Sequence, residues 1–269
     1  TATISGWGIP MATDIAFALG VISLLGKRVP ASLKIFLAAL AIADDLGAIL
    51  VIAIFYTENL HWDQLAYAAA ILSLLVIMNK AKLKNLLFYV VPGLFLWYFV
   101  HHSGIHATIA GVLLALTIPT NNTNKESPLE KLEHLIARPV NFLIMPVFAL
   151  ANTNIRFENT MIDGLSSPLG LGIIFGLMIG KPLGVTLFSW ISVKAGMASL
   201  PSGSTWEHIA GIGMLAGIGF TMSIFIALLS FNDPFYEAEA KFAILIASAC
   251  SGLLGYLFLG RLKRRVKLR

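Results

Sequence analysis

The sequence predicts an all-α polytopic membrane protein, from its composition and from the length of its apolar runs. Of its 269 residues, 57% are hydrophobic and 12% are charged, and the mean hydropathy is +0.82, whereas ordinary soluble domains carry about 25% charged residues. The runs are long enough to cross about 30 Å of hydrocarbon as helices, and none alternates with the period of two of a barrel strand. A β-barrel is therefore excluded, and residues 1–269 are predicted to form a single transmembrane domain.

Nine spans are predicted by reading the apolar runs against the polar segments between them. They are Ile4–Leu25, Ala31–Phe55, Leu65–Met78, Leu86–Val100, Ile105–Ile118, Val140–Ala151, Pro168–Ile191, Ile209–Ser230 and Phe242–Leu259. Several are shorter than about 17 residues or are interrupted, which a membrane tolerates where the loose backbone faces protein or a water-filled cavity. The polar segment before the sixth span contains Ser127-Pro-Leu-Glu130, a capping-box pattern that predicts a separate short helix on the cytoplasmic surface.

The basic residues predict the orientation of these spans. Fifteen of the nineteen Lys and Arg residues lie in the segments after spans one, three, five, seven and nine, and Lys34 lies at the start of span two on the same side. Because basic loops stay in the cytoplasm, the C-terminus is predicted to be cytoplasmic and the N-terminus external. The tail Arg261–Arg269, with six basic residues, is predicted to face anionic lipid, and nucleic acid is excluded as a partner. An external N-terminus implies an odd number of spans upstream of Thr1.

Two adjacent carboxylates, Asp44 and Asp45, lie in the run Ile35–Phe55, which holds no other charge. A carboxylate at that depth costs roughly 3 kcal/mol and by default marks an ion or proton path. Neighbours in a helix point about 100° apart, so the two acids should have different partners. Carboxylate oxygens suit Na⁺ or Li⁺, and protons should compete with the cation for them. A pair that only packs against neighbouring helices remains the alternative.

Lys181 lies in Ile174–Leu187, a run with no other charge. A buried ammonium needs a counter-ion, and the carboxylates within the predicted spans are Asp14, Asp44 and Asp45. The alternatives are that Lys181 extends to the surface or neutralises helix ends.

Two spans are interrupted, and they resemble each other weakly. The interruptions hold Gly8 and Pro10 in the first span and Gly217, Gly219 and Thr221 in the eighth. Gly8–Leu19 aligns without gaps on Gly217–Leu228, with five identities in twelve, and the two segments are predicted to run in opposite directions. Interrupted spans in an inverted repeat are a sequence pointer to a transport site. A match by shared apolar composition is the alternative.

Thr13 and Asp14 follow the first interruption. A break leaves free N–H groups and a positive helix end, which favours an electrostatic supporting role for Asp14, with direct ion binding as its second role. His106, Glu133 and His134 are candidates for pH sensing because they are titratable near a membrane surface. A hydrogen-bonded structural His106 and an ordinary solvated face containing Glu130 are their alternatives. Cys250, the one cysteine, is predicted to be a packing residue.

Other chemistries lack a pattern in the sequence. No P-loop is present, and no nucleophile has a base at a recognisable spacing, so an enzyme is not predicted. No cofactor is predicted besides the transported Na⁺ or Li⁺ and H⁺. A gated cation or proton channel and a sodium-coupled organic-anion symporter remain as alternatives to cation/proton exchange.

Five motifs together are specific enough to indicate a family. They are Ala12–Phe17 (ATDIAF), Ala43–Ala48 (ADDLGA), Gly104–Thr108 (GIHAT), Gly180–Gly184 (GKPLG) and Gly217–Ser223 (GIGFTMS). In these motifs the chain resembles the NhaA-type bacterial Na⁺/H⁺ antiporters. The resemblance implies an inner-membrane, inverted-repeat transporter of twelve helices with two discontinuous helices that cross, so that three spans would precede Thr1.

The resemblance also implies roles for single residues. Asp45 would bind the cation and exchange it for protons, Asp44 would take part and pair with Lys181, and Thr13 with Asp14 would lie at the crossing with Gly217–Ser223. Members of the family serve pH and sodium homeostasis, are shut at acidic pH, and are usually homodimers. The segment upstream of Thr1 would hold the usual dimer contact.

Overall fold

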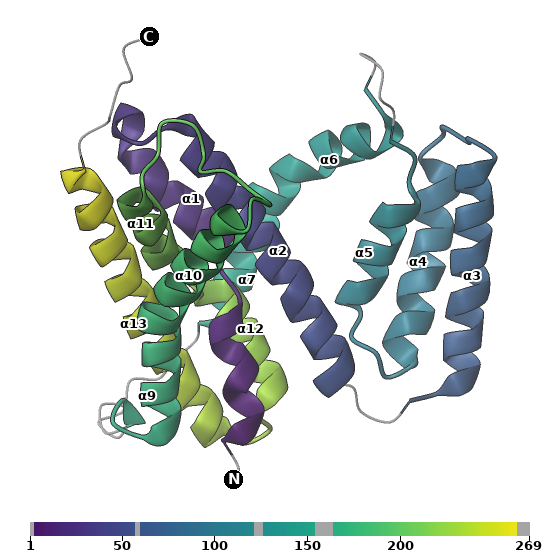
Figure 1. Ribbon diagram of the computed structural model, residues 1–269. Coiled ribbons are helices and arrows are strands. Elements are labelled where there is room, and N and C mark those ends of the chain that lie inside the picture. The colour runs from purple at the N-terminus through teal and green to yellow at the C-terminus, as the bar shows by residue number, and fades with distance from the viewer. Residues whose placement is uncertain (1–2, 57–59, 121–125, 154–163, 263–269) are drawn as a thin grey trace. The chain divides into compact units, whose positions relative to one another are not determined.

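The computed structural model of the protein describes residues 3–56, 60–120, 126–153 and 164–262 (Figure 1). Every regular element in these ranges is a helix, which confirms the all-α prediction. The chain divides into two compact units, Thr1–Ala48 with Leu150–Arg269 and Ile49–Ala149. Residues 263–269 of the predicted basic tail lie outside the described ranges.

The first unit contains both interrupted spans. Its elements are η1 (Ile4–Met11, a 3-10 helix), α1 (Ile15–Leu24), η2 (Gly26–Arg28), α2 (Ala31–Phe55, the last turns of which belong to the second unit), α9 (Pro168–Phe175), η4 (Gly176–Gly180, a π-helical turn), α10 (Lys181–Lys194), α11 (Trp206–Ala216), α12 (Phe220–Ser230) and α13 (Pro234–Arg261).

Small residues let these helices approach closely. Helix α11 packs against α10 and α13, and α12 packs against η1 and α13. A Cβ on Gly213 would lie 2.8 Å from the Cα atom of Pro182, and a Cβ on Gly255 would lie 2.6 Å from a Leu215 methyl carbon. Membrane helices associate through such small-residue contacts because lipid gives little hydrophobic drive between them. The glycines therefore set how near α10 and α13 come to α11.

The second unit is built on three helices that run side by side (Figure 1). Its elements are α3 (Trp62–Lys80), α4 (Leu87–His102), α5 (Thr108–Thr117), α6 (Pro128–Pro139), η3 (Val140–Ile144, a π-helical turn) and α7 (Met145–Asn152). Its core includes the fully buried side chains of Leu75, Tyr89 and Leu96, and the Tyr89 hydroxyl donates a hydrogen bond to the Leu83 carbonyl at 3.0 Å.

All nine predicted spans correspond to helices of the described residues. By length and apolar composition six helices can cross a membrane, a seventh crossing is the pair α11 and α12 bent by 48°, and α4 and α5 are shorter apolar helices. Two boundary predictions are wrong. Helix α13 begins at Pro234 and not at Phe242. The capping box of Ser127 and Glu130 is present, but α6 is not a separate helix, because η3 joins it to α7 in one continuous helix, Pro128–Asn152.

Candidate functional site

The two broken helices meet at their interruptions. The first break lies at residues 12–14, between η1 and α1, where Ala12 is extended. The break was predicted at Gly8 and Pro10, but both residues belong to η1, because a 3-10 helix accommodates Pro10. Helix α1 then begins after Asp14, which is its N-cap. The second break lies at residues 217–219 as predicted. The Asp14 N–H donates to the Ile218 carbonyl at 2.7 Å, so the two breaks are in direct contact.

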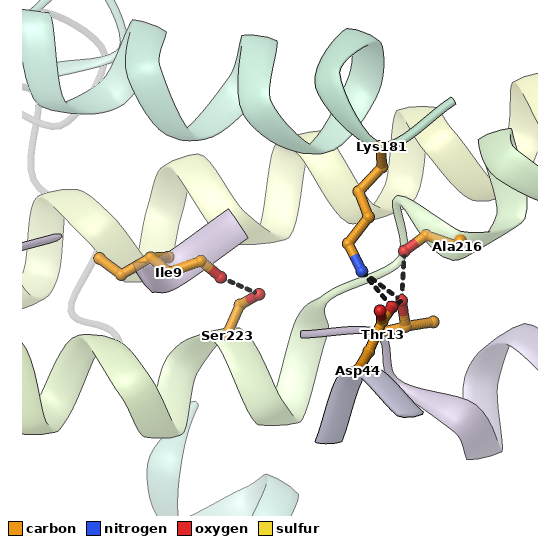
Figure 2. Close-up of polar contacts among 6 residues, drawn as sticks. All are labelled: Ile9, Thr13, Asp44, Lys181, Ala216 and Ser223. Carbon is orange, nitrogen blue, oxygen red and sulfur yellow. Dashed lines mark hydrogen bonds and ion pairs between the residues drawn. The ribbon is translucent and has the colours of Figure 1, made fainter. Parts of the chain in front are cut away.

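A reciprocal pair of contacts relates the two breaks. The Asp14 N–H donates to the Ile218 carbonyl. In return, the Ser223 hydroxyl donates to the Ile9 carbonyl at 2.8 Å, as Figure 2 shows. In the gapless alignment Ile9 matches Ile218 and Asp14 matches Ser223. In both segments the residue at one aligned position donates a hydrogen bond to the other segment, and the residue at a second aligned position accepts one. This is the pattern expected of an inverted repeat and not of a chance match in composition.

Asp14 caps two helices with one carboxylate. Its Oδ1 accepts from the Phe17 N–H at 3.1 Å, and its Oδ2 accepts from the Thr221 N–H at 3.1 Å and the Thr221 hydroxyl at 2.5 Å. The residue is 1% exposed. A carboxylate is favourable where helix N-termini leave unpaired N–H groups. With both oxygens occupied, Asp14 fits the supporting role better than direct ion binding.

Lys181 joins Asp44 and Thr13 in one partly buried network (Figure 2). Its ammonium forms an ion pair with Asp44 Oδ2 and donates to the Thr13 hydroxyl oxygen at 2.8 Å. That hydroxyl lies 2.7 Å from Asp44 Oδ2 and 2.9 Å from the Ala216 carbonyl. A hydroxyl has one proton to donate, so Thr13 can serve either the carboxylate or the end of α11 at any moment.

Asp45 lies outside this network. Its Oδ1 is buried and accepts no hydrogen bond from the part of the chain that the structure describes. A buried carboxylate oxygen without a donor is rare and calls for an explanation such as a bound ion or proton. The sequence prediction that the two acids have different surroundings therefore agrees with the structure, which pairs Asp44 and leaves Asp45 Oδ1 open.

A cavity of about 460 Å³ lies beside the ion pair. Asp44 and Lys181 line it together with apolar side chains that include Pro10, Met11 and Phe188. Lys181 reaches this place directly after the π-helical turn η4, in which the Lys181 N–H bonds to the Gly176 carbonyl five residues back. The next residue, Pro182, has no N–H to donate, which favours an irregular helix here.

The three candidate pH-sensing residues lie in the second unit. His106 is in the connection between α4 and α5, and its Nδ1 lies 3.1 Å from the Thr108 hydroxyl. Burial and, to a smaller extent, nearby His101 hold the pKa of His106 below its ordinary value. His101 belongs to the last turn of α4. Glu133 and His134 are exposed on α6, whereas the Glu130 carboxylate is engaged in the capping box.

One polar residue at the crossing is missed by sequence reasoning. Ser248, on α13, accepts hydrogen bonds from the N–H groups of Gly219 and Phe220 at the second break. Nothing in the sequence marks Ser248, because a hydroxyl costs little in an apolar helix that also contains other serines.

An all-α membrane protein in which two broken helices cross beside buried charges is a polytopic membrane transporter. The chain belongs to the Na⁺/H⁺ antiporter 1 family, whose sequence model matches residues 1–259.

Relatives with this activity in their names are similar along nearly the whole chain. Na⁺/H⁺ antiporter NhaA 2 of Flavobacterium johnsoniae is 65% identical over 96% of the chain and 63% of its own length. NhaA of Flavobacterium psychrophilum is 53% identical over 95% of the chain and 67% of its own length. NhaA of Escherichia coli O1:K1 is 49% identical over 99% of the chain and 68% of its own length. The chain thus spans about two thirds of the length of these curated relatives.

Proposed function

We propose that the protein exchanges Na⁺ or Li⁺ for H⁺ across the bacterial inner membrane by alternating access. The observation that carries this proposal is the buried Asp45 Oδ1 without a hydrogen-bond donor among the described residues. It lies one residue from Asp44, whose carboxylate is already paired with Lys181. Family membership and the names of the relatives support Na⁺ and H⁺ as the transported ions.

The chemistry is a competition at Asp45. An unpaired carboxylate in a poorly hydrated site is costly, and either a proton or a small alkali cation removes that cost. The two ligands need the same oxygen lone pairs, so their binding is coupled. When the site faces the cytoplasm the cation displaces protons, and when it faces outside protons displace the cation.

Lys181 supplies a second proton-releasing group. A cation that draws Asp44 away leaves the ammonium of Lys181 in a buried site without its counter-charge. A buried charge without a partner is strongly unfavourable, so Lys181 is then disposed to release a proton. Two proton-releasing groups for each cation make the exchange electrogenic, and its rate should respond to the membrane potential.

The test is cation-driven proton movement in proteoliposomes. An imposed Na⁺ gradient should change the internal pH with the wild-type protein, and Asp45→Asn should abolish the change because an amide cannot exchange a proton for a cation. Glu237→Gln is the matched control, since Glu237 pairs only loosely with Lys241, at 3.8 Å, and it should retain exchange. Full exchange by D45N would refute the assignment.

The same vesicles separate exchange from passive flux. A channel would conduct Na⁺ or H⁺ without obligatory coupling, and a symporter would require an organic anion; neither has an observation in its favour. Because the chain spans 63% of the Flavobacterium johnsoniae relative, the assay is run on the chain as given and on a chimera extended with the remainder of that relative.

A further inference from the structure

Helix α12 begins without a capping side chain of its own. Its N-cap residue is Gly219, and no side chain of the cap residue bonds the first turn. A Cβ at Gly219 would overlap the hydroxyl of Ser223, so a larger capping residue does not fit. The first N–H groups of a helix have no partner within it. The start of α12 therefore depends on acceptors from other elements.

Two side chains from other helices supply these acceptors. Asp14, at the start of α1, accepts the Thr221 N–H. Ser248, on α13, accepts the N–H groups of Gly219 at 3.2 Å and Phe220 at 3.1 Å through one oxygen. Ser248 is 6% exposed. Three successive N–H groups at the second break are thus bonded by residues far away in the sequence.

Ser248 lies on the helix that corresponds to α2 in the other half of the repeat. Helix α2 follows the first broken helix and α13 follows the second. In the first half, Gly47 of α2 lies beside Met11, because a Cβ on Gly47 would be 3.0 Å from the Met11 side chain. In the second half, Ser248 of α13 accepts a hydrogen bond from the N–H of Phe220, the residue that aligns with Met11. Each half of the repeat therefore brings its following helix close to its own break.

We propose that Ser248 is a positioning residue for cation exchange, an inference that rests on the proposed function. Its hydroxyl oxygen fixes the first turn of α12. That turn holds Asp14 through Thr221, and Asp14 adjoins Thr13 in the network of Lys181 and Asp44. Ser248 acts through these residues and does not bind the cation.

Three substitutions on α13 test this role. Ser248→Ala removes the acceptor and leaves two buried N–H groups without it, which is costly. Ser248→Thr keeps the hydroxyl, and its extra methyl has room because Ser248 lines an otherwise apolar cavity of about 480 Å³. Ser251→Ala is the matched control, since Ser251 is equally buried on the same helix and its hydroxyl has no hydrogen-bond partner among the described residues.

Two measurements are made on the purified protein. In proteoliposomes S248A should raise the apparent KM for Na⁺ roughly tenfold, the factor that about 1.4 kcal/mol produces. Amide hydrogen exchange at Gly219 and Phe220 should accelerate in S248A. S248T and S251A should match the wild type in both measurements.

The proposal is overturned if S248A keeps the wild-type KM, if its two amides exchange at the wild-type rate, or if S251A shows the same losses. Failure of the proposed function gives a different result, because the wild-type protein itself would then show no Na⁺-driven proton movement. The amide measurement still decides in that case whether Ser248 fixes the start of α12.

Discussion

Thr13 has more hydrogen-bond partners than its single proton can serve. Its hydroxyl accepts from Lys181 and lies within bonding distance of both Asp44 and the Ala216 carbonyl. When Asp44 is a free carboxylate, it is the stronger acceptor for the Thr13 hydroxyl proton. When Asp44 is neutralised or bound to a cation, the Thr13 hydroxyl can donate to the Ala216 carbonyl instead. Thr13 thereby links the charge state of the ion pair to the end of α11.

Thr13→Val should weaken this link while preserving the shape of the side chain. The substitution leaves the buried Ala216 carbonyl and Lys181 each without one partner, which costs about 1–3 kcal/mol for an unsatisfied group. We expect a lower midpoint of thermal unfolding in detergent and a higher apparent KM for Na⁺ in proteoliposomes.

Thr13→Ser, which keeps the hydroxyl, is the control and should remain near the wild type in both assays. Equal behaviour of T13V and T13S would show that the hydroxyl proton has no such role.

The charged residues of the site and the threonines beside its two breaks can be predicted from sequence, but Ser248 and the backbone carbonyls cannot. Asp44 and Lys181 stand out because an ionised group is expensive in a membrane span, and the structure brings them together. Ser248 gives no such signal, since a hydroxyl is cheap in a helix that also contains other serines. The carbonyls of Ala216 and Ile218 carry no side-chain signal at all, because they are exposed by the break itself.

At the scale of elements, close approach between α10 and α11 depends on Gly213. A Cβ there would lie 2.8 Å from the Pro182 Cα atom, and backbone can move aside less easily than a side chain. Gly213→Ala should therefore destabilise the protein by about 1–3 kcal/mol, the usual cost of overpacking, and should lower the midpoint of thermal unfolding.

Gly172→Ala on α9 is the control, because a Cβ at Gly172 meets no atom within 4 Å. It should be neutral or slightly stabilising, since alanine is the better helix former by up to about 1 kcal/mol. A G213A protein as stable as G172A would mean that α10 and α11 can separate without loss.

The helices themselves are predicted from sequence better than their irregularities. The bounds predicted for Ala31–Phe55 coincide with those of α2, because a long apolar run ends where polar residues begin. Helix α13 starts at Pro234 rather than Phe242, since Asp233 caps it and its first turns are polar. The π-helical turns η3 and η4 have no apolar period of their own, and the joining of α6 to α7 was missed for that reason.

For the whole molecule, the basic residues predict which ends of the helices face the cytoplasm. Lys131 and Asn232 are both exposed and are predicted to lie on opposite sides of the membrane. The protein has one cysteine, Cys250, so Cys250→Ala provides a background for single-cysteine labelling. A membrane-impermeant maleimide should label Asn232→Cys in intact cells, and Lys131→Cys only in everted vesicles. The reverse pattern would invert the orientation.

The site joins segments from both ends of the sequence. Thr13 bonds to a residue 203 positions away and Asp14 to one 207 positions away, and both contacts lie in the first unit. Closing such long loops is slow compared with forming local helices. The crossing can therefore be complete only after residues 216–221 have been made.

The π-helical turn η4, immediately before Lys181, contains one residue more than an α-helical turn would. If that turn tightened to the ordinary α pitch, the ammonium would swing by about 100° around the helix axis and leave its carboxylate. The rest of α10 keeps its place only if the wider turn moves further along the helix. A local twist would then be enough to withdraw a positive charge from the crossing, with no need for a helix to slide along its neighbours.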